Sequence, residues 1–104
     1  MNCIVLVGSL GGEPKVLIKG QEKSVRASIA TNEFYYNDAG ERCQRTDWHR
    51  LVFTKNLAEV AEKFLQKGST ISVRGKCRTV QGDNNKTYTY IQVDEFFMVG
   101  AKKN

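Results

Sequence analysis

The chain has 104 residues, 40% of them hydrophobic, which is enough for one small core and makes a single domain the first expectation. Sixteen Lys and Arg residues against 11 Asp and Glu give a formal charge of +5, which favours a polyanionic partner, although excess charge also keeps proteins in solution. The opening MNCIVLVG has a short apolar run without a basic lead-in, too short for a signal peptide or a membrane span. We therefore expect a cytoplasmic protein without a membrane partner.

The three cysteines, Cys3, Cys43 and Cys77, are odd in number, widely spaced and without a CxxC pair. This pattern argues against a disulfide framework and against structural zinc, whose ligands usually come in short paired spacings. Together with His49 the thiols would complete a set of four ligands, but their spacing favours buried or idle thiols. We expect no metal and no other cofactor.

Most of the chain has the pattern of strands. Residues 3–8, CIVLVG, predict a first strand that ends at Gly8, and the turn-rich SLGGEPK leads to a short extended segment at residues 16–18. Residues 25–31 alternate apolar and polar side chains, which is the period of a half-buried strand. The stretch YNDAGER then predicts a hairpin with its tip at residues 38–40.

The return strand of this hairpin contains TDWHRLVF, with the only Trp and the only His of the chain. Side chains alternate across a strand, so Trp48 and Arg50 point outward if Leu51 and Phe53 point into the core. An exposed Trp beside an exposed Arg suits nucleic-acid bases, because it offers a flat π face and a cation for the phosphate or the ring. The preceding arm, EFYYN, adds three more rings: Phe34, Tyr35 and Tyr36.

These four aromatic residues have two other interpretations. Rings also pack on one another in small proteins that are short of core volume, and Trp and Tyr are enriched at subunit interfaces. Exposed aromatics mark binding sites of several kinds, so periodicity alone leaves all three interpretations open and favours nucleic-acid stacking.

One segment, residues 56–67, has helical rhythm. Asn56 and Glu59 predict a capping pair at its start, and Lys67 followed by Gly68 predicts its end. Five apolar residues recur at helical spacing, and we assign this stripe to the core: Leu57, Val60, Ala61, Phe64 and Leu65.

The next segment, TISVRGKCR, alternates clearly, with Ile71, Val73, Gly75 and Cys77 on one face. The opposite face carries three cations, which we call the basic ladder: Arg74, Lys76 and Arg78. Alternating charges are most often the solvated face of a strand, and only their occurrence beside the aromatics favours a phosphate contact. A polar loop, QGDNNK, leads to the strand TYTYIQV, and FFMV predicts either a last short strand or a cover for the core.

The principal elements are thus three strands, a helix and two strands, which makes the fold class all-β. This is the order of the OB-fold, a five-stranded Greek-key barrel with one helix between strands 3 and 4, whose strands 2 and 3 bind oligonucleotides or oligosaccharides. We expect one such domain over residues 1–100 and a short basic end at residues 101–104.

Five segments, in the right order, resemble the OB domain of bacterial single-stranded DNA-binding proteins: IVLVGSLGGEP, ATNEF, TDWHRLVF, LAEVAEKFLQKGSTISVRGKCRT and TYTYIQV. The combination of WHRLV with LAEVAEKFLQKGS is highly specific. The resemblance implies a nucleoid-associated homo-oligomer, expected to be a tetramer with a dimer as the alternative. It would bind unpaired DNA without sequence preference in replication, recombination or repair, and perform no chemistry on it.

The resemblance also implies roles for single residues. Trp48 and Tyr35 fall where the family stacks bases, and His49 falls at a position used between subunits. Together with the analysis of the pattern, this gives the remaining predicted DNA contacts: Phe34, Tyr36, Arg50, Lys55, Lys67, Arg74, Lys76 and Arg78.

Three departures from the family pattern limit this transfer. Thr54 stands where the family often has an aromatic, with Phe53 one place earlier on the opposite face. The loop at residues 80–86 is short and lacks the Trp of many relatives. The chain ends in the basic GAKKN, whereas the family usually continues into a Gly/Pro/Gln-rich linker and an acidic tip that recruits other enzymes.

Two function classes therefore remain open. The first is a sequence-tolerant single-stranded DNA-binding protein, including paralogues from plasmids, phages or mobile elements. The second is an assembly factor similar to primosomal replication protein N, which acts mainly through replication-restart or recombination proteins. WHRLV and the aromatic residues favour the first class, and the missing acidic tail favours the second. An enzyme ranks third, because His49 has no nucleophile nearby in sequence and no Gly-rich phosphate loop or metal-ligand spacing occurs.

Overall fold

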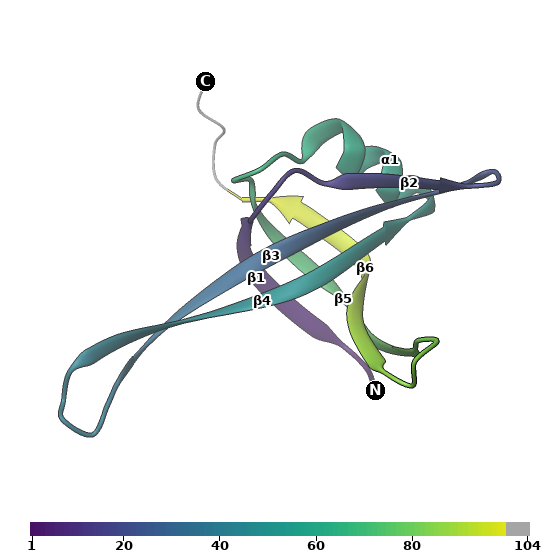
Figure 1. Ribbon diagram of the computed structural model, residues 1–104. Coiled ribbons are helices and arrows are strands. Elements are labelled where there is room, and N and C mark those ends of the chain that lie inside the picture. The colour runs from purple at the N-terminus through teal and green to yellow at the C-terminus, as the bar shows by residue number, and fades with distance from the viewer. Residues whose placement is uncertain (100–104) are drawn as a thin grey trace.

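The computed structural model describes residues 1–99, so residues 100–104, with the predicted basic end, lie outside the described part. Within it, six strands and one helix follow one another along the chain (Figure 1). Their bounds are β1 (Ile4–Leu10), β2 (Lys15–Lys19), β3 (Glu22–Tyr36), β4 (Arg42–Thr54), α1 (Lys55–Phe64), β5 (Thr70–Gln81) and β6 (Thr87–Met98).

The strands form one sheet in the order β1-β5-β6-β4-β3-β2. The end of β1 also pairs with β3, at Ser9↔Ala30 and Leu10↔Ile29, which closes five of the strands into a barrel and leaves β2 at the edge of β3. The helix lies between β4 and β5. The structure confirms the predicted all-β OB-fold; β2 is the short extended segment that the sequence places outside the five principal strands.

Several strands run beyond their predicted bounds: β3, for example, covers Glu22–Tyr36 rather than residues 25–31, and two other strands show why. β1 does not end at Gly8 but continues to Leu10, which is buried and pairs with Ile29. Phe96, Phe97 and Met98 form the end of β6 rather than a separate strand, and Val99 follows it. β6 continues past an irregularity at which Arg74 pairs with Glu95 and the next residue of β5 pairs with Val93. Tertiary pairing thus extends both strands beyond their local signals.

The helix is shorter than predicted. It ends at Phe64, and Leu65 already has an extended backbone, with φ −88° and ψ 142°. Leu65 turns into the core, and Gly68 donates its N–H to the carbonyl of Leu10, so contacts with β1 end the helix before Lys67. The predicted capping pair is also wrong: the N-cap residue is Thr54, and its side chain makes no capping hydrogen bond.

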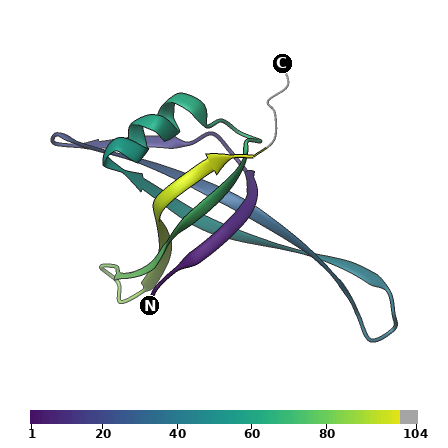
Figure 2. The ribbon, with the colours of Figure 1, turned by 180° about the vertical axis from the view of Figure 1, so that it is seen from behind.

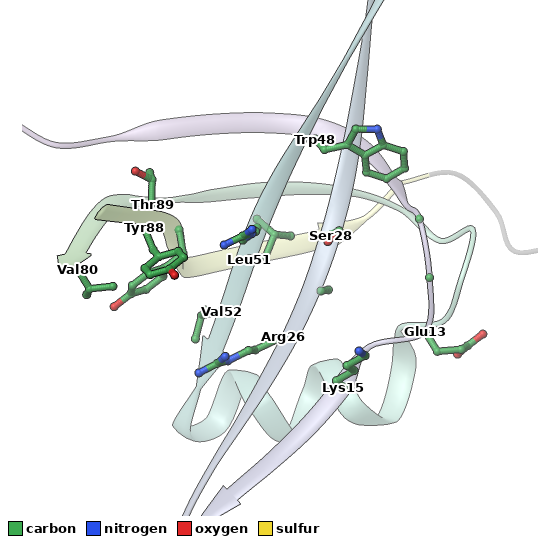
Figure 3. A pocket seen from close by; sticks show the side chains of 15 residues that line it. Glu13, Lys15, Arg26, Ser28, Trp48, Leu51, Val52, Val80, Tyr88 and Thr89 are labelled. Atoms are coloured by element: carbon green, nitrogen blue, oxygen red, sulfur yellow. The ribbon is translucent and has the colours of Figure 1, made fainter. Parts of the chain in front are cut away.

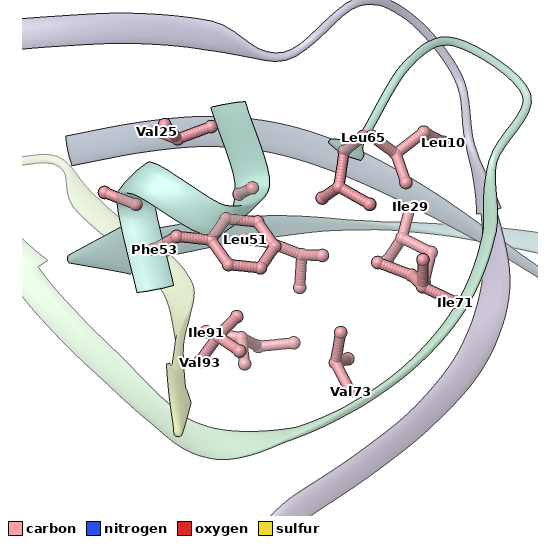
Figure 4. Close-up of a cluster of buried hydrophobic side chains, with 12 residues drawn as sticks. Leu10, Val25, Ile29, Leu51, Phe53, Leu65, Ile71, Val73, Ile91 and Val93 are labelled. Atoms are coloured by element: carbon pink, nitrogen blue, oxygen red, sulfur yellow. The ribbon is translucent and has the colours of Figure 1, made fainter. Parts of the chain in front are cut away.

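The core lies between the inner face of the barrel and α1 (Figure 4). The alternation predicted for the strands is confirmed, since Val25, Ile29, Leu51 and Phe53 are all completely buried. The ring of Phe53 also meets that of Phe96 edge to face, with centroids 5.1 Å apart. Burial of a large apolar side chain typically contributes about 1.5 to 3 kcal/mol, so these four residues anchor β3 and β4 to the rest of the barrel.

The helix contributes less to the core than its apolar stripe predicts. Ala58 and Ala61 are completely buried and Leu65 nearly so, whereas Val60 is 41% and Phe64 57% exposed. The buried face is centred on the two alanines, whose small side chains let the helix backbone approach the sheet. The two larger side chains consequently lie at the flank of the contact and remain in solvent.

The hairpin of β3 and β4 extends far beyond the barrel (Figures 1 and 2). The radius of gyration is 15.5 Å, against roughly 13 Å expected for a compact domain of 100 residues. We call its outer part, residues 32–46, the arm. At its tip, Asn37 Oδ1 accepts hydrogen bonds from the N–H groups of Ala39 (3.0 Å) and Glu41 (2.9 Å), which confirms the predicted hairpin tip. The barrel cannot cover the side chains of the arm, so they are available to a partner.

Candidate nucleic-acid interface

A groove of about 970 Å³ crosses the outer face of the barrel (Figure 3). It extends from the connection between β1 and β2 to the end of β5 and the start of β6, and β3 and β4 form its floor. Its lining combines rings with cations, chiefly Lys15, Arg26, Trp48, Arg50, Tyr88 and Tyr90.

The alternation of β3 and β4 explains why these residues meet. Trp48 pairs with Ala30 and Arg50 pairs with Ser28, and all four side chains point away from the core. Trp48 is 62% exposed, whereas its near neighbour Leu51 is completely buried. The structure thus confirms that Trp48 and Arg50 share the outer face and brings them together in one groove.

The electrostatics of the groove favour an anion. Within residues 1–99, no carboxylate lies within ion-pair distance of Lys15, Arg26 or Arg50. Glu13 also borders the groove, but its Oε2 accepts a hydrogen bond from the N–H of Lys67 at 3.2 Å. Its side chain points away from Arg26 in Figure 3, which leaves the cations of the groove to an outside partner.

The far end of the groove carries a ring that sequence analysis did not select. Tyr88 is 39% exposed and pairs with Val80 across the β5–β6 hairpin. The turn between these strands is short, as predicted, and is closed by a 2.7 Å hydrogen bond from the N–H of Gly82 to the carbonyl of Lys86. Although this loop lacks the Trp of many relatives, Tyr88 provides an aromatic side chain at this end of the groove.

The alternation of TYTYIQV contains the signal for this ring. Ile91 and Val93 are buried, so Tyr88 and Tyr90 must lie on the outer face. The same reasoning that places Trp48 on the surface finds both tyrosines, and it also finds Arg26 opposite Val52.

The three aromatic residues of the arm do not form one cluster with Trp48. Phe34 pairs with Gln44 and Tyr36 pairs with Arg42, which places both rings on the face that carries Trp48 nearer the barrel. The guanidinium of Arg42 lies 4.1 Å from the centroid of Phe34, a cation–π contact. Tyr35, in contrast, points to the opposite face of the arm, although all three rings are at least half exposed.

The basic ladder lies on the outer face of β5, as predicted, but it does not line the groove. Arg74 Nη2 lies 2.7 Å from Glu95 Oε1, and this hydrogen bond and the charge of Glu95 raise the pKa of Arg74. Arg78 donates its Nε–H to Gln92 Oε1 at 3.1 Å. Gln92 also pairs with Val52 at the floor of the groove, so Arg78 borders the groove while Arg74 lies farther from it.

The remaining predicted site residues lie apart from one another. Lys55 is exposed at the start of α1, with a left-handed φ of 56° that few residues other than glycine adopt. Lys67 lies in the connection after α1, beside Glu13. His49 is half-buried on the side opposite Trp48, with its Nε2 3.2 Å from the hydroxyl oxygen of Thr31.

The cysteines are free thiols and are not buried: Cys3 and Cys77 are exposed, and Cys43 is half-buried. Nowhere in residues 1–99 do three His, Cys, Asp or Glu side chains gather as a metal site requires. No helix of this part combines the length and apolar character needed to cross a membrane.

The fold and the groove define an OB-fold protein with an aromatic and basic outer surface. The model of the single-strand binding protein family matches residues 1–99. Single-stranded DNA-binding protein 1 of Xylella fastidiosa is 36% identical over 110 residues, which cover 100% of this chain and 81% of the relative. Its Chlorobaculum tepidum counterpart is 32% identical over 98% of this chain and 67% of the relative. The chain belongs to the single-strand binding protein family.

Solved structures agree with this assignment. A Plasmodium falciparum SSB in complex with ssDNA superposes with a TM-score of 0.86 at 32% identity, covering 96% of each chain. The small single-stranded DNA-binding protein of Streptomyces coelicolor has a TM-score of 0.75 at 20% identity, covering 92% of this chain and 90% of the other, which supports the fold alone. These names favour the first of the two function classes over an assembly factor of replication restart.

Proposed function

We propose that this protein binds single-stranded DNA in the groove, without sequence preference. One observation carries the proposal: Trp48 lies 62% exposed in a groove whose Arg26 and Arg50 have no carboxylate partner within the described part of the chain. Membership of the single-strand binding protein family supports it, as does the likeness to an SSB that is solved with ssDNA.

Two kinds of contact share the binding free energy in this proposal. Bases stack on Trp48 and Tyr88, and each base–aromatic stack is typically worth about 1 to 3 kcal/mol. Phosphates lie against Arg26, Arg50 and Lys15, and the release of counterions makes this part depend on salt. Ring faces and single cations contact every base and phosphate alike, which favours binding without sequence preference.

The arm extends this surface. Phe34 and Tyr36 continue the face of Trp48 outward, and we propose that they contact DNA beyond the groove. Tyr35 on the opposite face of the arm and the cations Lys55, Lys67, Lys76 and Arg78 are assigned secondary contacts, because none of them lines the groove.

We also propose that the chain assembles into a homo-oligomer, with a tetramer as the first expectation and a dimer as the alternative. An apolar strip on the outer face of β1 and β6 supports this proposal: Val5 is 61%, Val7 56% and Phe97 62% exposed. Val7 and Phe97 both pair with Ser72, so they lie on either side of β5 on one face. Exposed apolar patches often mark protein interfaces. His49 remains a predicted subunit contact.

The cellular role follows from DNA binding. We propose that the protein covers unpaired DNA during replication, recombination or repair, in the bacterial cytoplasm at the nucleoid. It acts as a binder that leaves the bonds of the DNA intact, without a cofactor.

A titration tests the proposed function. The full chain is titrated with oligo-dT at several salt concentrations, with the emission of Trp48 as the signal, while light scattering gives the mass. We expect saturable quenching, an affinity that falls as salt rises, and a mass of four chains or two. A DNA duplex of equal length is the control. Equal affinity for duplex and oligo-dT, or binding without any change in Trp48 emission, contradicts the proposal.

A further inference from the structure

The ring of Trp48 rests on the backbone of Gly11. A β-carbon built on Gly11 would lie 2.3 Å from Cζ3 and 2.7 Å from Cη2 of Trp48, distances that real β-carbons do not adopt. Gly11 belongs to the connection between β1 and β2, which passes beside the indole in Figure 3. Only a residue without a side chain allows the indole to lie where it does.

The ring at the other end of the groove has the same support. A β-carbon on Gly82 would lie 2.6 Å from Cε2 and 3.3 Å from Cδ2 of Tyr88. The hydrogen bond from Gly82 to Lys86 closes the turn and fixes the backbone on which the ring rests. Two exposed rings, contributed by different hairpins, are therefore each placed against a glycine.

We propose that Gly11 and Gly82 are positioning residues, which hold Trp48 and Tyr88 as two prearranged stacking sites at the two ends of the groove. Each ring packs against backbone yet keeps much of its surface in solvent, 62% for Trp48 and 39% for Tyr88. A ring held in this way loses less side-chain freedom when a base stacks on it, which strengthens binding. This inference rests on the proposed function.

Alanine is a clean probe at both positions. Neither glycine has a left-handed φ, so alanine can adopt the local backbone, and the added methyl group acts mainly on the neighbouring ring. The chain also offers a matched control in the same connection: a β-carbon on Gly12 would meet no atom within 4 Å. Gly11→Ala and Gly12→Ala thus add the same group to adjacent residues, with and without a ring in its way.

The first measurement uses the free protein. Trp48 is the only Trp, so its emission maximum and its quenching by acrylamide report on this ring alone. We expect Gly11→Ala to shift the emission and raise the quenching, because the methyl group displaces the indole from the backbone. We expect Gly12→Ala and Gly82→Ala to leave both quantities as in the parent.

The second measurement is a pair of double-mutant cycles with labelled oligo-dT. We expect Gly11→Ala to weaken binding about tenfold in the parent and to have no further effect when Trp48 is already alanine. Gly82→Ala should likewise weaken binding only while Tyr88 is present. Circular dichroism during heating checks that the variants fold. If Gly11→Ala does not fold, the cycle of Gly82 with Tyr88 decides the proposal.

The outcomes separate this inference from the proposed function. If Gly11→Ala leaves the emission of Trp48 unchanged, or weakens binding equally with and without the indole, Gly11 does not act through Trp48 and the inference is wrong. The same holds for Gly82 if its effect persists in Tyr88→Ala. If Trp48→Ala itself leaves the affinity for oligo-dT unchanged, the proposed function is wrong.

Discussion

The groove and the basic ladder each carry three cations on the outer face of the barrel, yet their surroundings differ. In the groove, Lys15, Arg26 and Arg50 lie among exposed rings and have no ion-pair partner within the part of the chain that the structure describes. In the ladder, Arg74 is paired with Glu95, and Arg78 donates to Gln92. The three cations of the groove come from β2, β3 and β4, whereas those of the ladder alternate along β5. The first set thus forms a surface open to a polyanion, and the second is partly satisfied within the chain.

This difference has a physical consequence for DNA binding. A cation without a partner neutralises a phosphate and releases the counterion, whereas a cation already neutralised by a carboxylate gains less. Rings add a contribution that salt hardly affects. We therefore expect the groove to supply most of the affinity and the ladder little, and four measurements test that expectation.

The largest expected effect belongs to Trp48. Trp48→Ala should weaken binding to labelled oligo-dT by about 1 to 3 kcal/mol, because one base–aromatic stack is lost. Thermal stability should change little, since the side chain is 62% exposed. Trp48→Phe, which keeps a smaller ring, should retain part of the lost affinity. If both variants bind like the parent, the groove is not the stacking surface.

The cations of the two regions should differ in their effect on salt dependence. For single strands, the logarithm of the affinity falls with that of salt by about 0.7 per neutralised phosphate. Replacing Arg26 and Arg50 together by alanine should therefore lower the slope by about 1.4. The matched double variant Arg74→Ala with Lys76→Ala removes the same charge from the ladder and should leave the slope nearly unchanged. Equal reductions would falsify the distinction between groove and ladder.

The sequence predicts which side chains lie on the outer face of the barrel, because apolar and polar residues alternate along the strands. With Leu51 and Phe53 inside, Trp48 and Arg50 must lie outside, and the structure confirms it. The same rule applied to TYTYIQV gives Tyr88 on the outer face. The fold follows similarly, because strand periods and one helical segment fix the order of elements that an OB-fold requires.

Contacts between residues that are distant in the sequence could not be predicted. Nothing local in the sequence indicates that Glu95 pairs with Arg74, since the two residues meet only when β5 and β6 pair. The support of Trp48 by Gly11 likewise appears only when β1 and β4 close into one barrel. The helix ends early for the same reason, because Leu65 enters the core.

A smaller effect is expected at Thr54. It follows Val52 on the outer face of β4 and makes no capping hydrogen bond to α1, so a larger side chain removes no bond. Thr54→Phe adds a ring beside the groove and should raise the affinity for oligo-dT by no more than about tenfold. The gain should be clearest at high salt, where the contribution of the cations has faded. A gain confined to low salt contradicts stacking as its cause. Thr54→Leu is the control for added apolar bulk without a ring.

The smallest expected effect concerns the pair of Arg74 with Glu95. Glu95→Gln removes the carboxylate that lies 2.7 Å from the guanidinium of Arg74. Glu95 raises the pKa of Arg74, so its loss only returns that pKa toward the ordinary value, and Arg74 stays protonated at neutral pH. Both side chains are about half exposed, so stability should hardly change. Without Glu95, the guanidinium of Arg74 is free to attract a phosphate, so the salt dependence of oligo-dT binding should become steeper. Because Arg74 lies away from the groove, we expect the slope to change by less than about 0.7, the value for one fully neutralised phosphate. The same change in an Arg74→Ala background should have a still smaller effect. If Glu95→Gln steepens the slope by about 0.7 or more, and does so only while Arg74 is present, the basic ladder lies on the DNA path. The distinction between groove and ladder is then wrong.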